Sequence, residues 1–169
     1  YSADTTLFVT NGLGSLSDAI TCTVVEERNG IYELTMTYPV NGSHYADISE
    51  RSIIYAIPSP YRNPQPFRIY QIEAPLNGIV TIHAHHISYD LSGLAVSPCS
   101  ITGTAEQAMN LMLSNAQGAS SFVFASDVTG NKTFEDKVPS SFRAMLGGTE
   151  GSVLDLYHGE FLFDEFDVH

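Results

Sequence analysis

Strict alternation of apolar and polar residues dominates residues 16–39. The apolar positions fall at every second residue on both sides of a central break, and they are Ile20, Cys22, Val24, Tyr32, Leu34, Met36 and Tyr38. A period of two places one apolar face on a core and one polar face toward water. Asn29-Gly30 stands at the break, and Asn-Gly pairs supply the positive φ angles of tight hairpin turns. The pattern predicts one long β-hairpin, with Cys22 as a small buried residue.

A second alternating stretch begins at Phe67 and predicts another β-hairpin. Its outgoing strand runs to Ala74, and Asn77-Gly78 forms the turn. The return strand alternates an apolar face with a polar one, made respectively of Val80, Ile82, Ala84 and of Thr81, His83, His85. We expect the apolar face to join the same core as the first hairpin. A valine at Gly30, in the first turn, is expected to cost more stability than replacing any histidine with alanine.

Shorter elements complete the first part of the chain. Leu7–Thr10 is predicted as a short strand, and residues 44–50 as a loose helical turn. Residues 51–57 are almost continuously apolar, which favours a strand in the centre of a sheet. The proline-rich residues 58–66 predict an exposed, stiff loop.

The spacing of apolar residues changes from strand-like to helix-like around residue 102. The sequence from Thr104 to Gln107 has the form of a capping box, with Thr104 as the N-cap. The alanines and methionines that follow recur at helical spacing, and Gly118 is the expected C-terminal stop. A short helix is predicted over 142–146, and another begins after Thr149, its expected N-cap.

These elements predict a β-dominated α+β fold in two parts. We expect a barrel-like β-hairpin domain over residues 1–101 and a smaller mixed helix and strand sub-domain over residues 102–169. A hydrophobic content of 43% is sufficient for a real core. The structural residues that we single out are two pairs of turn residues and two helix caps: Asn29, Gly30, Asn77, Gly78, Thr104 and Thr149.

The charge balance excludes several kinds of partner. The net charge is −12, with only seven Lys and Arg residues. Binding to nucleic acid or to an anionic membrane surface needs clustered positive charge, so we expect neither sequence-specific nucleic-acid binding nor membrane binding. No apolar run approaches the roughly 20 residues of a membrane-spanning helix. Cys22 and Cys99 are too few and too far apart for a disulfide or metal framework.

Two groups of residues are candidates for chemistry. His83 and His85 project from the same face of a strand and could offer two imidazoles to a metal, but no third ligand or recognised zinc motif accompanies them. A dense carboxylate group near the end of the chain has the composition of a glycosidase pair, at Glu160, Asp164, Glu165 and Asp167. The chain has no tryptophan to stack on sugar rings. We therefore expect no metal, no cofactor and no catalytic residue.

Three stretches of the chain together resemble one known family. They are residues 16–40 (LSDAITCTVVEERNGIYELTMTYPV), 65–93 (QPFRIYQIEAPLNGIVTIHAHHISYDLSG) and 146–169 (LGGTEGSVLDLYHGEFLFDEFDVH). In content and order they are similar to the N-terminal region of phage minor structural proteins. These are tail-tip proteins of long-tailed phages and prophages, also called tail-associated hub, tail-lysin or prophage tail endopeptidase-like proteins.

The resemblance implies a structural role in a virion. Such a protein is a homotrimeric baseplate hub that closes the tail tube, beside the distal tail protein and the tape-measure protein. It anchors C-terminal domains that degrade the host wall or attach to the host. The resemblance thus implies a protein of the tail tip, encoded by a phage or prophage and made in the bacterial cytoplasm. Family members continue past the last strand, so we expect this chain to be truncated.

Two other functions remain as alternatives. The region could form part of a cell-wall-degrading peptidase or glycosidase, or it could be a receptor- or carbohydrate-binding module. An acidic surface suits a conduit through which DNA passes without adhering, which favours the hub.

Overall fold

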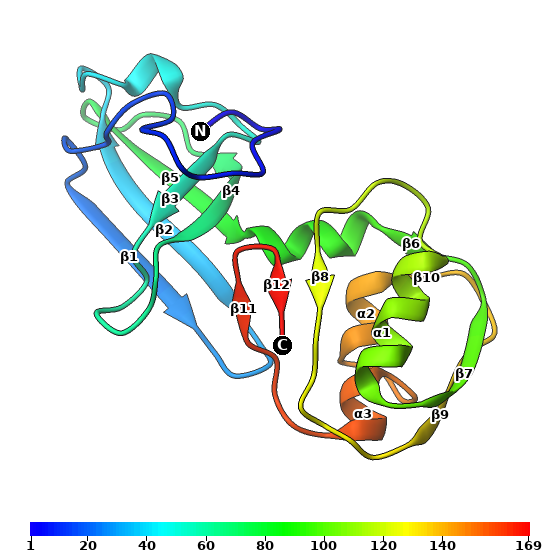
Figure 1. The fold of residues 1–169 in the computed structure, drawn as a ribbon. Coiled ribbons are helices and arrows are strands. Elements are labelled where there is room, and N and C mark those ends of the chain that lie inside the picture. Colours follow the sequence, from blue (N-terminus) through cyan, green and yellow to red (C-terminus); the bar gives the residue numbers. More distant parts are fainter. The chain divides into compact units, whose positions relative to one another are not determined.

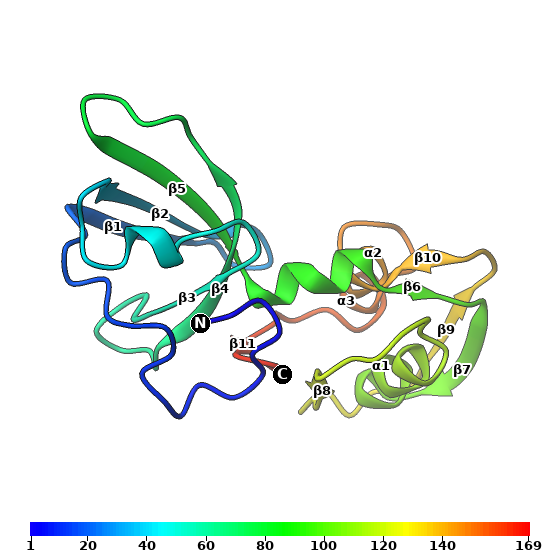
Figure 2. The same cartoon turned by 90° about the horizontal axis from the view of Figure 1, so that it is seen from above.

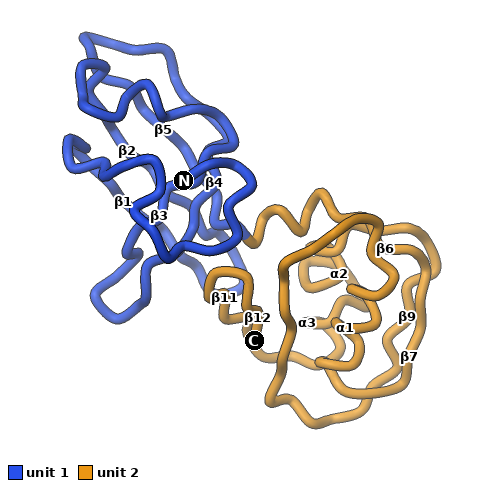
Figure 3. The backbone as a smooth tube through the Cα atoms, turned by 45° about the horizontal axis from the view of Figure 1, so that its top comes forward, with its two compact units in different colours: residues 1–87 blue, residues 88–169 orange.

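The computed structural model describes residues 1–169. The chain forms two compact units, Tyr1–Ile87 and Ser88–His169 (Figure 3). The division falls earlier in the sequence than residue 102, because β7 (Cys99–Gly103) runs across that position and pairs with β9 (Lys132–Asp136). The residues just before the sequence-based boundary therefore pair with those after it.

The first unit is built on a five-stranded antiparallel sheet with the strand order β1-β2-β5-β4-β3. Its strands are β1 (Thr21–Glu26), β2 (Tyr32–Pro39), β3 (Ile53–Ala56), β4 (Gln65–Ile72) and β5 (Ile79–His86). The sheet curls into an open half-barrel, and one short 3-10 helix, η1 (Tyr45–Asp47), connects β2 to β3 (Figures 1 and 2). The prediction of a β-dominated α+β fold is confirmed.

The core of this unit lies on the inner face of β2, β5 and β4. Leu34 pairs with Ala84 and Met36 with Ile82, and all four side chains are buried. Phe67 on β4 is also fully buried. The alternation in β2 and β5 therefore marks the core correctly, since every second side chain of these two strands faces inward.

Three sequence-based expectations for this unit are wrong. Residues 7–10 carry no regular secondary structure. The strand expected at the centre of the sheet, β3, lies at its edge. Cys22 is exposed, because β1 is the other edge strand and the covering layer on the inner face stops at β2. The position of a strand in a sheet depends on its partners, which local sequence does not encode.

The second unit combines short strands with three helices. After η2 (Ile87–Gly93), its elements are β6 (Ala95–Val96), β7, α1 (Ala105–Ser114), β8 (Val123–Phe124), β9, β10 (Ser140–Ser141), α2 (Phe142–Leu146), α3 (Val153–Tyr157), β11 (Phe163–Asp164) and β12 (Asp167–Val168). Two strand pairs, β10-β6 and β7-β9, accompany a three-stranded group, β11-β12-β8. Helix α1 buries Met109 and Met112, and the rings of Phe124 and Phe142 stack at 5.0 Å.

Helix α1 is shorter than the sequence predicts. It ends at Ser114, with Asn115 as its C-cap, rather than near Gly118. The Asn115 side chain donates a hydrogen bond to the carbonyl oxygen of Leu111 and so satisfies one of the open carbonyls at the helix end. No helix in residues 1–169 is long and apolar enough to cross a membrane.

Candidate functional site

The outer face of the first sheet carries a cluster of paired polar side chains around β5. We call it the histidine face, and it consists of Glu33, Thr35, Tyr70, Glu73, His83 and His85. His83 Nε2 lies 2.9 Å from Glu73 Oε1, and His85 Nε2 lies 3.1 Å from Glu33 Oε1. All four of these side chains are partly exposed. The cluster is therefore a structured surface that a partner could reach.

A β-bulge places Tyr70 on this face. The pairing of β4 with β5 shifts register between Ile69 and Gln71, so Tyr70 is the extra residue. Its ring stacks on the imidazole of His85 with centroids 3.9 Å apart and lies 6.1 Å from that of His83. This bulge is not predictable from the alternation of apolar and polar residues, which indicates a regular β4.

His83 and His85 do not share a ligand position. Each Nε2 hydrogen-bonds a different carboxylate, and Nδ1 of His83 lies 3.4 Å from the hydroxyl of Thr35. No group of three or more His, Cys, Asp or Glu residues in the chain is arranged to hold a metal ion. The two imidazoles that the sequence singles out are thus members of two separate His–Glu pairs.

Threonines extend the polar outer face toward β1. The hydroxyls of Thr21 and Thr37 lie 2.7 Å apart across the β1–β2 pair, and Thr37 is opposite Thr81 on β5. Such cross-strand threonine pairs stabilise a sheet by a few tenths of a kcal/mol to about 1 kcal/mol each. The outer face therefore presents hydroxyl, imidazole and carboxylate groups across three adjacent strands.

The β3 edge of the sheet is covered by the chain itself. The backbone of Tyr1 both donates to and accepts from Ile53, at 2.9 and 3.0 Å. The ring of Phe8 stacks on that of Tyr55 at 4.8 Å, and the ring of Tyr1 packs edge-on against both. Arg68 Nη1 donates to the carbonyl of Ala3 at 2.8 Å, which fixes the same segment. Residues before β1 thus protect this edge.

The β1 edge, in contrast, is open (Figure 1). Glu27 N donates to Ile31 O at 2.7 Å, which sets the alternation: odd-numbered residues of β1 bond β2, and the backbone groups of Cys22 and Val24 point outward. No backbone partner lies on that side of either residue. From Thr21 to Val25 the strand has no charge and no proline. It therefore lacks the usual protections of an edge strand.

A cleft of about 850 Å³ lies between the segment that precedes β1 and the inner face of the sheet. Its walls are mainly apolar and include Phe8, Leu16, Cys22, Met36 and Ile69. The cleft extends as far as β1, where it is lined by Cys22, which is exposed. The apolar inner face thus continues to the open edge without a cover.

The two predicted turns differ in conformation. Asn77 and Gly78 both have positive φ, at 52° and 79°, and Leu76 and Ile79 exchange two backbone hydrogen bonds around them. This is the two-residue turn expected of an Asn-Gly pair. At the first turn Asn29 has φ 54°, but Gly30 does not have positive φ. That loop holds three residues between Glu27 and Ile31. Gly30 therefore lies in the turn as predicted, but the positive φ expected of it is wrong.

The two predicted helix caps also differ. Thr104 caps α1: its hydroxyl accepts from Gln107 N while Gln107 Oε1 accepts from Thr104 N. Thr149 is not the cap of α3, because the helix begins at Val153 and its N-cap is Ser152, whose hydroxyl accepts from Asp155 N. The hydroxyl of Thr149 instead donates to the carbonyl of Ala144.

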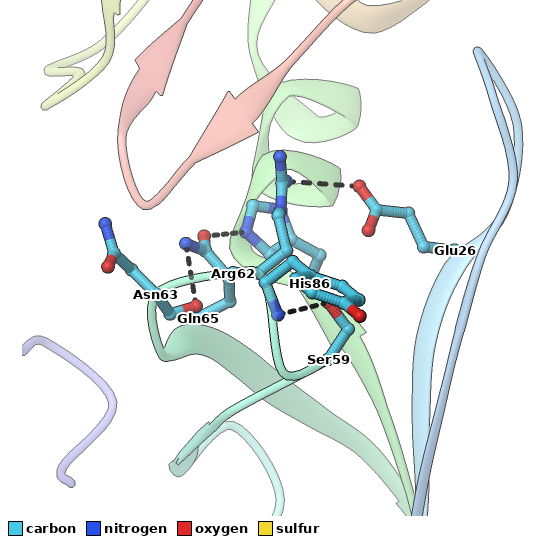
Figure 4. Close-up of polar contacts among 7 residues, drawn as sticks. Glu26, Ser59, Arg62, Asn63, Gln65 and His86 are labelled. Atoms are coloured by element: carbon cyan, nitrogen blue, oxygen red, sulfur yellow. Dashed lines mark hydrogen bonds and ion pairs between the residues drawn. The ribbon is translucent and has the colours of Figure 1, made fainter.

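His86 belongs to the core rather than to the surface. It is fully buried, its ring stacks on Tyr32 at 4.4 Å, and its Nε2 donates to Gln65 Oε1 at 3.1 Å (Figure 4). In the loop before β4, Arg62 pairs with Glu26 at 3.1 Å and so ties that loop to the end of β1. These contacts rigidify the end of the sheet where β1 stops.

The carboxylates near the end of the chain surround a tight turn. Asp164 and Asp167 are cross-strand partners of β11 and β12, and Glu165 between them has φ 53°. This placement accounts for the density of acidic residues, since Asp and Asn favour turns.

The curled sheet with its mixed second unit is the fold of a phage tail protein. One solved structure with this fold is the prophage tail protein gp18 from Listeria monocytogenes EGD-e, with a TM-score of 0.69 and 14% sequence identity. The match covers 90% of this chain and 45% of that chain, so this chain spans less than half the length of the Listeria protein. No protein-family model matches the chain, and no curated protein matches it in sequence.

Proposed function

We propose that this chain is a structural component of a phage or prophage tail. The observation that carries the proposal is the likeness in fold to a prophage tail protein over 90% of the chain. The acidic balance, −12, is compatible with a conduit for DNA, because like charge keeps the passing DNA from adhering.

Within the tail, we assign the chain to the hub of the tail tip. There it forms a homotrimer, contacts the distal tail protein and the tape-measure protein, and anchors further domains that act on the host. The open β1 edge and the histidine face support this role, because a subunit of a closed ring needs surfaces for two neighbours. The role of this region is to assemble and position, not to catalyse.

Electron microscopy of phage tails with a gold-labelled antibody against this chain tests the assignment. Label confined to the tail tip is the expected result. Label along the tube, or on particles without tails only, contradicts the hub. A peptidoglycan turnover assay and a glycan-binding screen then separate the hub from a wall hydrolase and from a carbohydrate-binding module, and neither is expected to give a signal.

A further inference from the structure

The first unit contains an open sheet edge and a strand-like segment that do not pair with each other. One is the open edge of β1, with outward backbone groups at Cys22 and Val24. The other is Leu7–Thr10, which has the composition of a strand but carries no regular structure. Leu7 and Val9 are 72% and 85% exposed and have no backbone hydrogen bond. An edge with outward backbone groups and a segment in which the backbone groups of Leu7 and Val9 are unbonded are both sites for strand addition.

We propose that Leu7–Thr10 of one copy of this chain adds as a strand to the β1 edge of a second copy. This pairing would be the contact between copies in the proposed homotrimer. It rests on the proposed function only for the number of copies.

The segment is already held in a suitable orientation. Phe8 is anchored in its own unit by stacking on Tyr55. Leu7 and Val9 on either side of it are largely exposed, although Val9 also lines the apolar cleft of its own unit. Leu7 and Val9 can therefore face a neighbour while Phe8 stays in place.

The apolar surfaces also fit. Antiparallel pairing with Val9 opposite Cys22 puts Leu7 opposite Val24, so the backbone groups that point outward from β1 meet those of two alternate residues of the added segment. The side chains of Leu7 and Val9 then lie on the inner face, beside the exposed Cys22 and the half-buried Val24. An added strand thus extends the cover of the sheet beyond β2.

The symmetry of this contact differs from that of β1 pairing with itself. The donor segment and the acceptor edge are different surfaces of one chain, so the contact is heterologous and closes into a ring or continues as a filament. A ring of three copies agrees with the proposed homotrimer. Pairing of two β1 edges instead gives an isologous dimer with no place for a third copy.

Cysteine cross-linking tests the contact, because Cys22 is already in position. We would replace Cys99 with serine and Val9 with cysteine, and oxidise with copper–phenanthroline and dissolved oxygen, which accepts the two electrons of each new disulfide. Directly opposite residues of a hydrogen-bonded antiparallel pair have Cα atoms about 5.5 Å apart, within the range of a disulfide. Partial desolvation raises the pKa of the Cys22 thiol, so the reaction is run at alkaline pH.

Two control chains give the comparison its meaning. Cys99→Ser alone retains only Cys22 and reports β1 edges that pair with each other. Val138→Cys with Cys99→Ser places the second thiol on a valine that is 63% exposed in the other unit. The solution mass of each chain before oxidation is measured by light scattering across a concentration series.

The expected result is a ladder of covalent dimers and trimers for the Val9→Cys chain and at least tenfold less cross-link for both controls. A disulfide within one chain overturns the proposal, since the segment then pairs in its own unit. A Cys22–Cys22 cross-link in the Cys99→Ser chain also overturns it, in favour of an isologous dimer. A trimer by mass without the Val9→Cys cross-link overturns the strand addition but leaves the hub standing. Label away from the tail tip contradicts the hub independently of the cross-link.

Discussion

The two edge strands of the first sheet differ in their cover: the chain covers one edge and leaves the other open. At β3, the backbone of Tyr1 and a cluster of three aromatic rings cover the edge. At β1, the outward backbone groups of Cys22 and Val24 and the exposed side chain of Cys22 stay uncovered. Natural sheets usually protect both edges, because an open edge is a template for pairing with other chains. An edge that is left open beside a protected one therefore indicates a place for a partner strand.

The inner face of the sheet shows the same asymmetry along a single row. Val24, Leu34 and Ala84 are neighbours across β1, β2 and β5. Leu34 and Ala84 are fully buried, whereas Val24 is only half-buried. Burial of the inner face therefore decreases between two adjacent strands, β2 and β1. Matched substitutions of Leu34 and Val24 compare the stability that each side chain contributes.

The largest expected effect comes from this row. Leu34→Ala should lower the free energy of unfolding by about 3 kcal/mol, because it leaves a cavity in a closed core. Val24→Ala should lower it by less than about 1 kcal/mol, because the valine is already part of a surface. Urea denaturation of the dilute chain measures both. Equal losses would show that β1 is covered in solution, and repeating the experiment at high concentration would reveal whether a second copy provides the cover.

The two hairpins give the next contrast, since one carries the open edge and the other lies inside the sheet. Gly78→Val should cost about 1 to 3 kcal/mol, because φ is 79° there and a β-branched residue is strained in that region. Gly30→Val should cost less, since Gly30 does not need positive φ and a Cβ there would meet the side chain of Glu27 at 3.1 Å and the Arg28 carbonyl oxygen only at 3.7 Å. Thermal melting of the two variants measures the difference, and the reverse order would contradict it.

The conformation of Gly30 reverses the order of stability losses that the sequence predicts for Gly30→Val and the histidine-to-alanine variants. His86→Ala should now cost more than Gly30→Val, because His86 is fully buried, stacked and hydrogen-bonded to Gln65. The two Asn-Gly pairs look identical in sequence, but the loops that contain them hold two and three residues. The same dipeptide therefore places its glycine in different conformations.

Sequence alone predicts the parts of this fold that depend on local pattern. The alternation of Val80, Ile82 and Ala84 identifies the core face of β5, and the capping box at Thr104 identifies the start of α1. The order of strands in the sheet depends on contacts between distant residues. The exposure of Cys22 on an edge strand could therefore not be predicted from the sequence. The N-cap of α3 was predicted wrongly for another reason, because Thr149 and Ser152 are both good N-cap residues and lie three positions apart.

The candidate surfaces were less predictable than the core. His83 and His85 were expected on one face of a strand, but their separate carboxylate partners come from β2 and from the end of β4. The bulge at Tyr70 left no trace in the alternation of β4. The strand expected at Leu7–Thr10 is wrong for the isolated chain, and its strand-like composition is the feature that the proposed pairing uses.

A substitution at the covered β3 edge should cost less stability than Leu34→Ala in the core or Gly78→Val in the turn. Phe8→Ala should lower the free energy of unfolding by about 1 kcal/mol, through loss of the stacking on Tyr55. It should also speed hydrogen exchange at the amide of Ile53, whose partner is Tyr1. Leu7→Ala is the matched control and should change neither quantity in the dilute chain. Unchanged exchange at Ile53 in Phe8→Ala would show that the ring cluster does not hold the cover in place.

The smallest effect concerns how the segment before β1 is held, and it depends on pH. Asp18 Oδ2 accepts a hydrogen bond from Ser43 N at 2.7 Å, and this backbone hydrogen bond keeps the pKa of Asp18 below its ordinary value. A lowered pKa means that the contact stabilises the folded chain above the ordinary aspartate range, about pH 4, and that the stabilisation is lost as pH falls through the folded-state pKa. Asp18→Asn should therefore melt below wild type at pH 6, and the gap should narrow as the pH falls below the ordinary aspartate range. Asp4→Asn, at an exposed carboxylate of the same segment, serves as the control, and a pH-independent gap for Asp18→Asn would contradict the role of its charge.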